Sequence, residues 1–369
     1  MNNEKRFPGK LALQQRVLPV YRAAFFNALA AACDGGLSVF AGPPHPVESI
    51  TVTDRLQTAR FVPAENIHLG KYPNFVCWQN GLMDWLRDWN PDALVVEANS
   101  RYLSTPQAVN WMRRRDRPVV GWGLGAPPLS GPLAGFRQMR RRQFLSRFDA
   151  LIAYSRRGAD EYAALGYPAE RIFVAPNAAT ARPTLSPPSR PLGVRAQPVV
   201  LFVGRLQARK RVDQLIRACA ALREDLKPRL LIVGDGPELD ALRTLAARIY
   251  PDASFLGERH GLEVRPFFEM ADLFVLPGTG GLAVQEAMAH GLPVIVAQGD
   301  GTQDDLVRPQ NGWQVPPDNA DMLVETLRLA LSDLNRLRIM GAASYSIVAN
   351  EINIEKMTEV FVGVLNQLT

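Results

Sequence analysis

The stretch Leu276–Ile295, LPGTGGLAVQEAMAHGLPVI, carries the clearest structural pattern in the sequence. It follows the apolar run Asp272–Leu276, which is typical of a buried parallel strand. A glycine-rich turn, a helix-forming segment with Glu286 and a second apolar run at Val294–Val296 come next. In α/β proteins such a unit holds phosphates, because glycines let N–H groups approach an anion and the helix dipole favours negative charge. The stretch therefore predicts a phosphate-binding βαβ unit.

Length and composition set the broad class. At 369 residues the chain exceeds what one hydrophobic core usually serves, so we expect two domains. A net charge of +6 and a pI near 9.4 favour anionic partners, although a basic solvated surface explains them equally well. Cys33, Cys77 and Cys219 are widely spaced in apolar segments, which predicts buried thiols in a reducing compartment. The first apolar runs are too short for a signal peptide, so a cytoplasmic location is expected.

Apolar runs of strand length alternate with helix-forming segments in both halves, which predicts mostly parallel sheets built from βαβ units. The runs are Leu11–Leu13, Leu37–Phe40, Ala93–Val96, Pro118–Trp122, Ala150–Ala153 and Ile172–Val174, then Val199–Val203, Leu230–Val233, Ser254–Leu256, Leu273–Leu276 and Val294–Val296. Between the halves, residues 181–198 are rich in proline and lack any period. We expect one domain at residues 1–182, a linker at 183–198 and a second domain at 199–349.

Three loops of the second half present glycines, cations or a helix start after a strand. They are Gly204-Arg205 with Lys210, then Gly234-Asp-Gly236, then Gly280-Gly281. Arginine and lysine bind phosphate, and a carboxylate such as Glu286 accepts hydrogen bonds from ribose hydroxyls. Each feature alone is more often a tight turn or an ordinary helix carboxylate. Together they predict a site for a nucleoside diphosphate.

Other nucleotide and metal motifs are missing. There is no G-x-x-x-x-G-K-[ST] motif and no D-x-D pair, and Gly121-Trp-Gly-Leu-Gly125 does not complete a dinucleotide fingerprint. The four histidines show no metal-ligand spacing. They are His45, His68, His260 and His290. We therefore expect a leaving group stabilised by arginine, lysine and backbone N–H groups without a metal ion.

The second half, over Val199–Asp321, resembles the donor domain of retaining GT-B glycosyltransferases, glycosyltransferase family 4. The motifs that carry the resemblance are Val203-Gly-Arg-Leu206 with Lys210 and Asp213, Leu231-Ile-Val-Gly-Asp-Gly-Pro237, Phe255-Leu-Gly257 and Glu286-Ala-Met-Ala-His-Gly-Leu-Pro-Val294. The first half is more loosely similar to the family's acceptor domain. That similarity rests on Pro91–Val96, Tyr154-Ser155 and Val174–Asn177.

The resemblance implies an α/β fold of the GT-B type, with two Rossmann-like doubly wound parallel-sheet domains facing each other across a cleft. A C-terminal helix at about 350–369 would pack back on the first domain. The implied activity is retaining transfer of a hexose from a nucleoside diphosphate sugar to a glycan or lipid-linked acceptor, with no cofactor and no nucleic acid partner. Arg205 and Lys210 would bind the diphosphate and Glu286 the ribose. The implied donor-binding set also includes Gly204, Gly234, Gly236, Gly278, Thr279, Gly280, Gly281 and Leu282.

Three positions depart from the family's pattern. The family usually has two glutamates separated by seven residues, and the first of these positions is Gly278 here. A frequent His-Gly pair is replaced by Leu124-Gly125, and a Lys-Gly pair by Lys210-Arg211. Backbone N–H groups of residues 279–282 would take over the binding of the missing carboxylate. Nucleoside base, sugar and acceptor are left open.

On the acceptor side, strand-end loops of the first half carry polar residues and glycines. The candidates are Arg16, Glu97, Asn99, Arg101, Gly123 and Gly125, for which a solvated loop is the alternative explanation. The segment Phe136–Phe148 places apolar side chains near one helical face and arginines elsewhere. It is either an ordinary domain helix or a peripheral contact with the inner face of an anionic membrane.

Two other functions compete with sugar transfer. One is a nucleotide-sugar epimerase of the same architecture, which would need carboxylates and a histidine that these positions do not clearly show. The other is a catalytically silent protein that binds a nucleotide sugar, suggested by Gly278 and Leu124 at the usual glutamate and histidine positions.

Overall fold

The computed structural model describes residues 6–48, 50–190, 197–299 and 301–369. Contacts divide the chain into two compact units, one of Met1–Ala181 with Ile354–Thr369 and one of Arg182–Asn353. Both units are α/β structures built on a parallel sheet, which confirms the expected fold class. In the part of the chain that the structure describes, no helix has the length and apolar character needed to cross a bilayer.

A seven-stranded parallel sheet forms the centre of the first unit. Its strands are β1 (Leu11–Val17), β2 (Leu37–Gly42), β3 (Arg60–Pro63), β6 (Ala93–Glu97), β7 (Val119–Gly123), β8 (Ala150–Ala153) and β9 (Ile172–Val174), in the order β3-β2-β1-β6-β7-β8-β9. The chain leads away from β1 in one direction and returns to its other side at β6. The switch point of this sheet is therefore between β1 and β6, where α/β sheets usually bind ligands.

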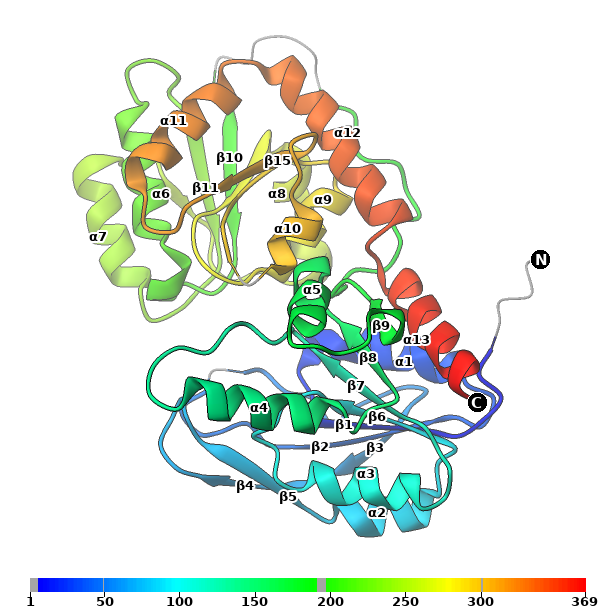
Figure 1. Cartoon of the computed structure of the whole chain (residues 1–369). Helices are drawn as coiled ribbons and strands as arrows, with labels where there is room; N and C mark the ends of the chain where they lie inside the picture. The colour runs from blue at the N-terminus through cyan, green and yellow to red at the C-terminus, as the bar shows by residue number, and fades with distance from the viewer. Residues whose placement is uncertain (1–5, 49, 191–196, 300) are drawn as a thin grey trace. The chain divides into compact units, whose positions relative to one another are not determined.

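Helices cover both faces of this sheet (Figure 1). The helices α1 (Ala23–Ala31) and α13 (Ile354–Leu368) cover one face, and α2 (Leu82–Trp89) and α3 (Thr105–Arg113) cover the other. The rings of Phe25 and Trp122 each lie 5.1 Å from the ring of Phe361. This aromatic packing makes α13 part of the first unit's core although it is the last element of the chain.

Part of the first unit was not predicted. Besides β3 and α2, the sequence pattern missed a hairpin of β4 (Glu65–Leu69) and β5 (Val76–Asn80). Strand β4 alternates exposed and half-buried positions and β5 alternates half-buried and buried ones, so both lack the continuous apolar run that marked the buried strands. The three cysteines are buried and free, as expected.

The second unit has a six-stranded parallel sheet in the order β12-β11-β10-β13-β14-β15. The strands are β10 (Val199–Val203), β11 (Arg229–Val233), β12 (Ser254–Phe255), β13 (Leu273–Leu276), β14 (Val294–Ala297) and β15 (Gly312–Val315). The helices are α6 (Val212–Ala221), α7 (Leu239–Ile249), α8 (Arg265–Met270), α9 (Leu282–Ala289), α10 (Thr302–Leu306), α11 (Ala320–Leu331) and α12 (Leu334–Asn350). Helix α6 contacts α7 and α11, and α9 contacts α12. The switch point of this sheet lies between β10 and β13.

The start of the second unit is fixed by Arg190. Its guanidinium donates to the carbonyl oxygens of Phe268, Ala271, His290 and Gly291 over distances of 2.9–3.1 Å. Residues 182–190, which we expected in the first domain and the linker, therefore belong to the second unit. The rest of the expected linker includes residues 191–196, which lie outside the described residues.

Candidate functional site

The three predicted loops of the second unit follow β10, β11 and β13, which are neighbours in the sheet. Their carboxyl ends meet at one edge of the sheet, because parallel strands all end on the same side. The glycine-rich loop at residues 277–281 thus lies beside the switch point.

Close packing against the loop after β10 explains the two glycines after β11. A Cβ atom at Gly234 would lie 2.0 Å from the carbonyl oxygen of Gly204, and one at Gly236 would lie 2.3 Å from that of Leu206. The N–H of Leu206 also donates to the carbonyl oxygen of Asp235 over 2.8 Å. These glycines therefore have a structural role in joining the two loops, whether or not they also bind a ligand.

Residues 208–210 pack against the glycine-rich loop. Ala208–Lys210 form a 3-10 turn, Arg211 is left-handed with φ of 56°, and α6 begins at Val212. The turn brings the carbonyl oxygen of Arg209 within 3.0 Å of the N–H of Thr279, which donates to it. Lys210 Nζ donates to the carbonyl oxygen of Thr279 over 2.8 Å.

Gly278 occupies a position with no space for a side chain. A Cβ atom there would lie 2.1 Å from the carbonyl oxygen of Arg209 and 2.5 Å from the Cα atom of Lys210. The family's usual glutamate would not fit at this position, because the 3-10 turn approaches Gly278 too closely. Among the N–H groups of residues 279–282 that we expected to bind the ligand, that of Thr279 donates to the carbonyl oxygen of Arg209.

Two cations lie beside the loop at Gly280. An added Cβ atom there would be 3.3 Å from Arg209 Nη1 and 3.4 Å from Lys210 Nζ. Arg209 was not among the predicted site residues, because only the turn at 208–210 reveals its position. Arg205, predicted to bind the diphosphate, is an exposed residue directly after Gly204.

Lys210 is unusually buried for a lysine, with only 8% of its surface exposed. Burial, together with the smaller effect of the neighbouring charge of Arg209, lowers its pKa to about 8. An anion placed beside this ammonium would favour its charged form. Lys210 is thus a strong candidate for binding a phosphate group.

Glu286 lies in α9, five residues into the helix that follows the loop. Burial raises the pKa of its carboxyl group, and no hydrogen bond to that group is recorded within the described residues. Leu282, the first residue of the helix, is 37% exposed and Gly281 precedes it as the N-cap. A partly buried carboxylate with no partner among the described residues is suited to accept hydrogen bonds from a ligand's hydroxyl groups.

In the first unit, Arg16 and Glu97 meet at the switch point between β1 and β6. The N–H of Arg16 donates to Glu97 Oε1 over 3.1 Å. The Arg16 guanidinium, however, forms a two-point ion pair with Glu48 at 2.7 and 2.9 Å. Glu48 thus holds the Arg16 side chain, and contact of Arg16 with an acceptor stays a prediction.

The other acceptor-side candidates line a cavity of about 1010 Å³ in the first unit. Glu97, Asn99, Arg101, Gly123 and Gly125 are among its lining residues. The structure thus brings together five of the six acceptor-side candidates, and Arg16 is the one outside the lining.

Both glycines also have packing reasons. A Cβ atom at Gly123 would lie 2.6 Å from Tyr162 Oη, and one at Gly125 would lie 2.4 Å from Glu161 Oε2. Tyr162, which lines the cavity, was missed by the sequence, since a tyrosine inside α5 (Arg156–Ala164) carries no motif.

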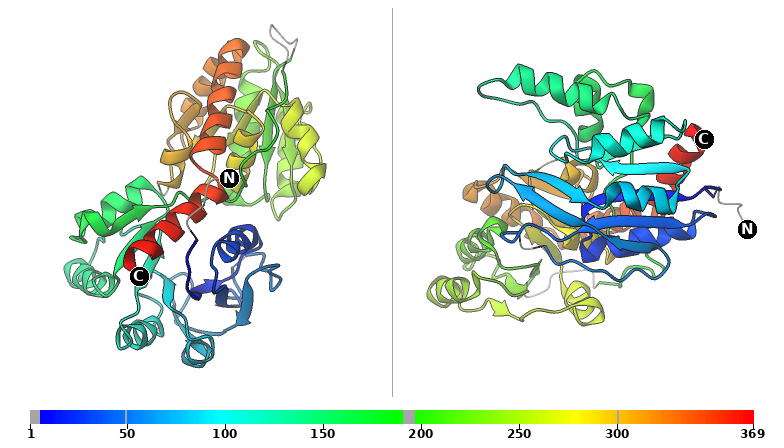
Figure 2. Two further views of the ribbon diagram at one scale, coloured as in Figure 1. Left: turned by 90° about the vertical axis from the view of Figure 1, so that its right-hand side faces the viewer. Right: turned by 90° about the horizontal axis from the view of Figure 1, so that it is seen from below.

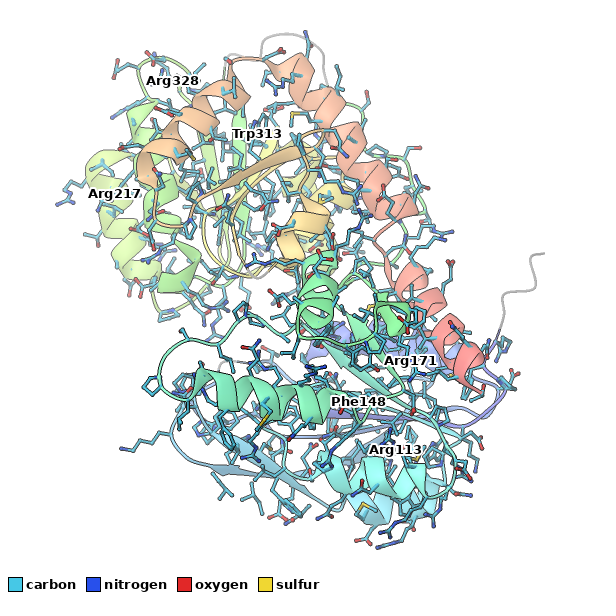
Figure 3. The ribbon with its side chains drawn as sticks, viewed as in Figure 1. Arg113, Phe148, Arg171, Arg217, Trp313 and Arg328 are labelled. Atoms are coloured by element: carbon cyan, nitrogen blue, oxygen red, sulfur yellow. The ribbon has the colours of Figure 1, made fainter. Side chains whose placement is uncertain are left out.

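The segment Phe136–Phe148, for which we left a domain helix and a membrane contact open, belongs to α4 (Ala134–Leu145) and the turn after it, and most of its apolar side chains are core. Phe144, Leu145 and Phe148 are 8%, 2% and 2% exposed, and Phe148 lies past the end of α4 against the sheet (Figure 3). Only Phe136 and Met139, at 52% and 47%, remain exposed. The C-terminal half of α4 therefore packs on the sheet.

Family models match both halves of the chain. Residues 191–346 match the model described as "Glycosyl transferases group 1", and residues 20–178 match the "Glycosyl transferase 4-like domain". The chain belongs to the group 1 glycosyltransferases of GT-B fold.

Individual relatives agree with this family. A GDP-mannose-dependent alpha-mannosyltransferase of Mycolicibacterium smegmatis is 43% identical over 116 residues, covering 31% of this chain and 28% of the relative. The chain aligns with only 28–38% of the length of the first curated relatives.

Solved structures of the same fold match nearly the whole chain. Sucrose-phosphate synthase of Thermosynechococcus elongatus has a TM-score of 0.70 at 19% identity and covers 97% of this chain and 98% of its own. HepE of Anabaena in complex with UDP has a TM-score of 0.69 at 18% identity and covers 97% and 99%. At these identities the similarity shows the fold alone.

Proposed function

We propose that this glycosyltransferase moves a hexose from a nucleoside diphosphate sugar to a glycan or lipid-linked acceptor with retention of configuration. The observation that carries the proposal is the pair of cations, Arg209 and Lys210, placed against the glycine-rich loop at Gly280. The helix that follows this loop carries the unpartnered carboxyl group of Glu286. Cations for a diphosphate and an acceptor for ribose hydroxyls thus lie on adjoining elements.

In the proposed reaction, the bond from the sugar's anomeric carbon to the diphosphate oxygen breaks and a bond from that carbon to the acceptor oxygen forms on the same face. The proton of the acceptor hydroxyl passes to the departing phosphate, so no protein nucleophile is needed. Lys210, Arg209 and loop N–H groups, joined by the predicted Arg205, stabilise the charge on the leaving diphosphate. Losing one such donor typically costs about 2–4 kcal/mol of transition-state stabilisation.

The leaving group's charge is assigned to the chain's own cations rather than to a metal ion. Lys210 supplies a charge beside the loop, as does Arg209. Transfer should therefore continue at an unchanged rate when EDTA is added and should not increase with Mg²⁺ or Mn²⁺. A rate that falls at least tenfold in EDTA and returns with a divalent cation would contradict this assignment.

Incubation with UDP-, GDP- and ADP-sugars, followed by measurement of nucleotide release, tests the proposed activity. Release that depends on an added acceptor, with the product's anomeric configuration equal to the donor's by NMR, is the expected result. Binding without release would instead indicate the silent nucleotide-sugar binder. Interconversion of the sugar without acceptor would indicate an epimerase.

Peripheral contact with the inner face of an anionic membrane is the last part of the proposal. It rests on Leu133, Phe136 and Met139, which are 74%, 52% and 47% exposed at the N-terminal half of α4. Sedimentation with anionic vesicles should show salt-sensitive binding that weakens in Phe136→Ser/Met139→Ser. The matched control Leu262→Ser removes a side chain that is 82% exposed in the second unit, and it should bind as the wild type does. Equal vesicle binding by all three proteins would refute the contact.

A further inference from the structure

The cavity of the first unit is lined mainly by positive charge. The loops after β6 and β7, together with the segment from α4 to residue 147, form its wall, and Figure 2 shows α4 (green) at the edge of this unit, joined to β7 by a long loop. Five arginines line it, whereas Glu97 is its single lining carboxylate. The arginines are Arg101, Arg137, Arg140, Arg141 and Arg147.

The arginines are concentrated by the geometry of α4. Arg137, Arg140 and Arg141 are spaced three and four residues apart, so they share one face of the helix. Like charges at this spacing repel each other and destabilise an isolated helix. The arrangement is therefore unfavourable unless something else on that face compensates the charge.

Little negative charge in the lining compensates these arginines. Glu97 accepts a hydrogen bond from the N–H of Arg16 and interacts with the Tyr102 hydroxyl, and burial raises the pKa of its carboxyl group. Burial also lowers the pKa of the Arg141 guanidinium, and the charges of Arg137 and Arg101 add to this effect while Glu161 opposes it. The cluster thus carries an excess of positive charge in a partly desolvated place.

Several hydrogen-bond donors on the side chains that line the cavity have only neutral acceptors, or none among the described residues. Arg101, Arg137 and Arg141 donate to the carbonyl oxygens of Pro73, Ser130 and Pro127, which are neutral acceptors. No partner is recorded within the described residues for the side chains of Arg140 and Arg147. Two fully buried donors of lining residues, Trp122 Nε1 and Tyr162 Oη, also lack an acceptor there.

We propose that this cavity binds the acceptor through an anionic group, a phosphate or phosphodiester held by the arginines of α4 and by Arg147. The inference rests on the proposed glycosyl transfer and specifies its acceptor class. A guanidinium binds a phosphate through two parallel hydrogen bonds, and such charge-assisted bonds are stronger than bonds to neutral carbonyls. The phosphate belongs either to a soluble phosphorylated sugar or to a lipid headgroup.

The test uses the full chain carrying Lys210→Met, which weakens anion binding at the nucleotide loop of the second unit. Calorimetric titration with glucose 6-phosphate, with glucose as the neutral control, should show binding of the phosphorylated sugar at least tenfold tighter. Adding Arg140→Gln/Arg147→Gln should weaken it at least tenfold. The matched control Arg113→Gln/Arg114→Gln removes two exposed charges of the α3 region outside the cavity and should change it less than twofold.

A second arm uses phosphatidylcholine vesicles with and without phosphatidylinositol. Binding that requires phosphatidylinositol and is lost in Arg140→Gln/Arg147→Gln, without binding of glucose 6-phosphate, supports a lipid headgroup as the source. The inference is overturned if Arg140→Gln/Arg147→Gln and Arg113→Gln/Arg114→Gln change the binding of the probe equally. It is also overturned if neither glucose 6-phosphate nor the vesicles bind. Wild-type UDP or GDP binding, measured in parallel, separates the two proposals: if it is intact, only the anionic acceptor is refuted, and if it is absent, the proposed transfer itself fails.

Discussion

Lys210 and Thr279 hold two loops of the second unit together through a hydrogen bond of 2.8 Å from the ammonium to the carbonyl oxygen. The N–H of Thr279 donates to the neighbouring carbonyl oxygen of Arg209, so the contact has two points. A phosphate oxygen is a stronger partner for an ammonium than a neutral carbonyl is. The bond therefore holds Lys210 in place for a diphosphate without competing strongly with it.

Replacing Lys210 with methionine should stabilise the protein without ligand. Burial lowers the lysine pKa to about 8, which disfavours its charged form in the folded state. At pH 7 this penalty amounts to about 3 kcal/mol, against about 1 kcal/mol for the lost hydrogen bond. Thermal unfolding should show a higher Tm at pH 7. The advantage should shrink as the pH rises from 8 toward 10.4, because the folded wild type then loses its proton before the unfolded chain does. A lower Tm at pH 7 would contradict the burial argument, and exposed Lys71→Met should leave Tm unchanged.

Binding of UDP or GDP should be coupled to proton uptake near pH 8. The anion favours the ammonium form of Lys210, whose pKa of about 8 leaves it partly deprotonated there. Affinity should accordingly fall as the pH rises above 8. Calorimetry in buffers of different ionisation enthalpy measures the uptake directly. The same uptake in Lys210→Met would show that another group takes the proton.

Restoring the family's usual glutamate at position 278 should impair the protein rather than improve it. The Cβ atom alone would lie 2.1 Å from the Arg209 carbonyl oxygen, so the 3-10 turn must move. Overpacking of this kind costs about 1–3 kcal/mol. Even Gly278→Ala should lower Tm and weaken nucleotide binding, whereas Gly363→Ala, at a helical glycine with open space around it, should not. Tighter nucleotide binding by Gly278→Glu would show that the turn is easily displaced.

Glu286→Gln should separate ribose binding from diphosphate binding. Burial raises the carboxyl pKa in the folded state, so the wild type loses stability as the pH rises past the glutamate's ordinary pKa. The glutamine variant should therefore be at least as stable as the wild type at pH 7. It should bind UDP and GDP more weakly but inorganic pyrophosphate equally, since pyrophosphate has no ribose. An equal loss for all three ligands would point to a general disruption of α9.

The buried strands were predictable because each forms a continuous apolar run, as Val199–Val203 does. The hairpin β4–β5 was not predictable, since Glu65–Leu69 mixes polar and apolar residues and so resembles a polar loop. The apolar spacing of Phe136–Phe148 predicted a helix but could not show that its C-terminal half packs on the sheet.

Some site residues could also be predicted from the sequence, and others could not. The positions of Lys210, Gly280 and Glu286 followed from motifs after strands. The proximity of Arg209 to Gly280 depends on a 3-10 turn that ends in left-handed Arg211, and no local signal favours that conformation in an arginine. The pairing of Arg16 with Glu48 and the gathering of arginines around one cavity join residues far apart in the sequence.

The central claim is that Lys210 binds the diphosphate of a nucleotide donor. Calorimetric titration of UDP and GDP into the wild type, Lys210→Met and the control Lys71→Met tests it most directly. We predict that at least one nucleotide binds the wild type and Lys71→Met equally, and binds Lys210→Met at least tenfold more weakly at pH 7. Equal affinity of Lys210→Met and the wild type would contradict the account.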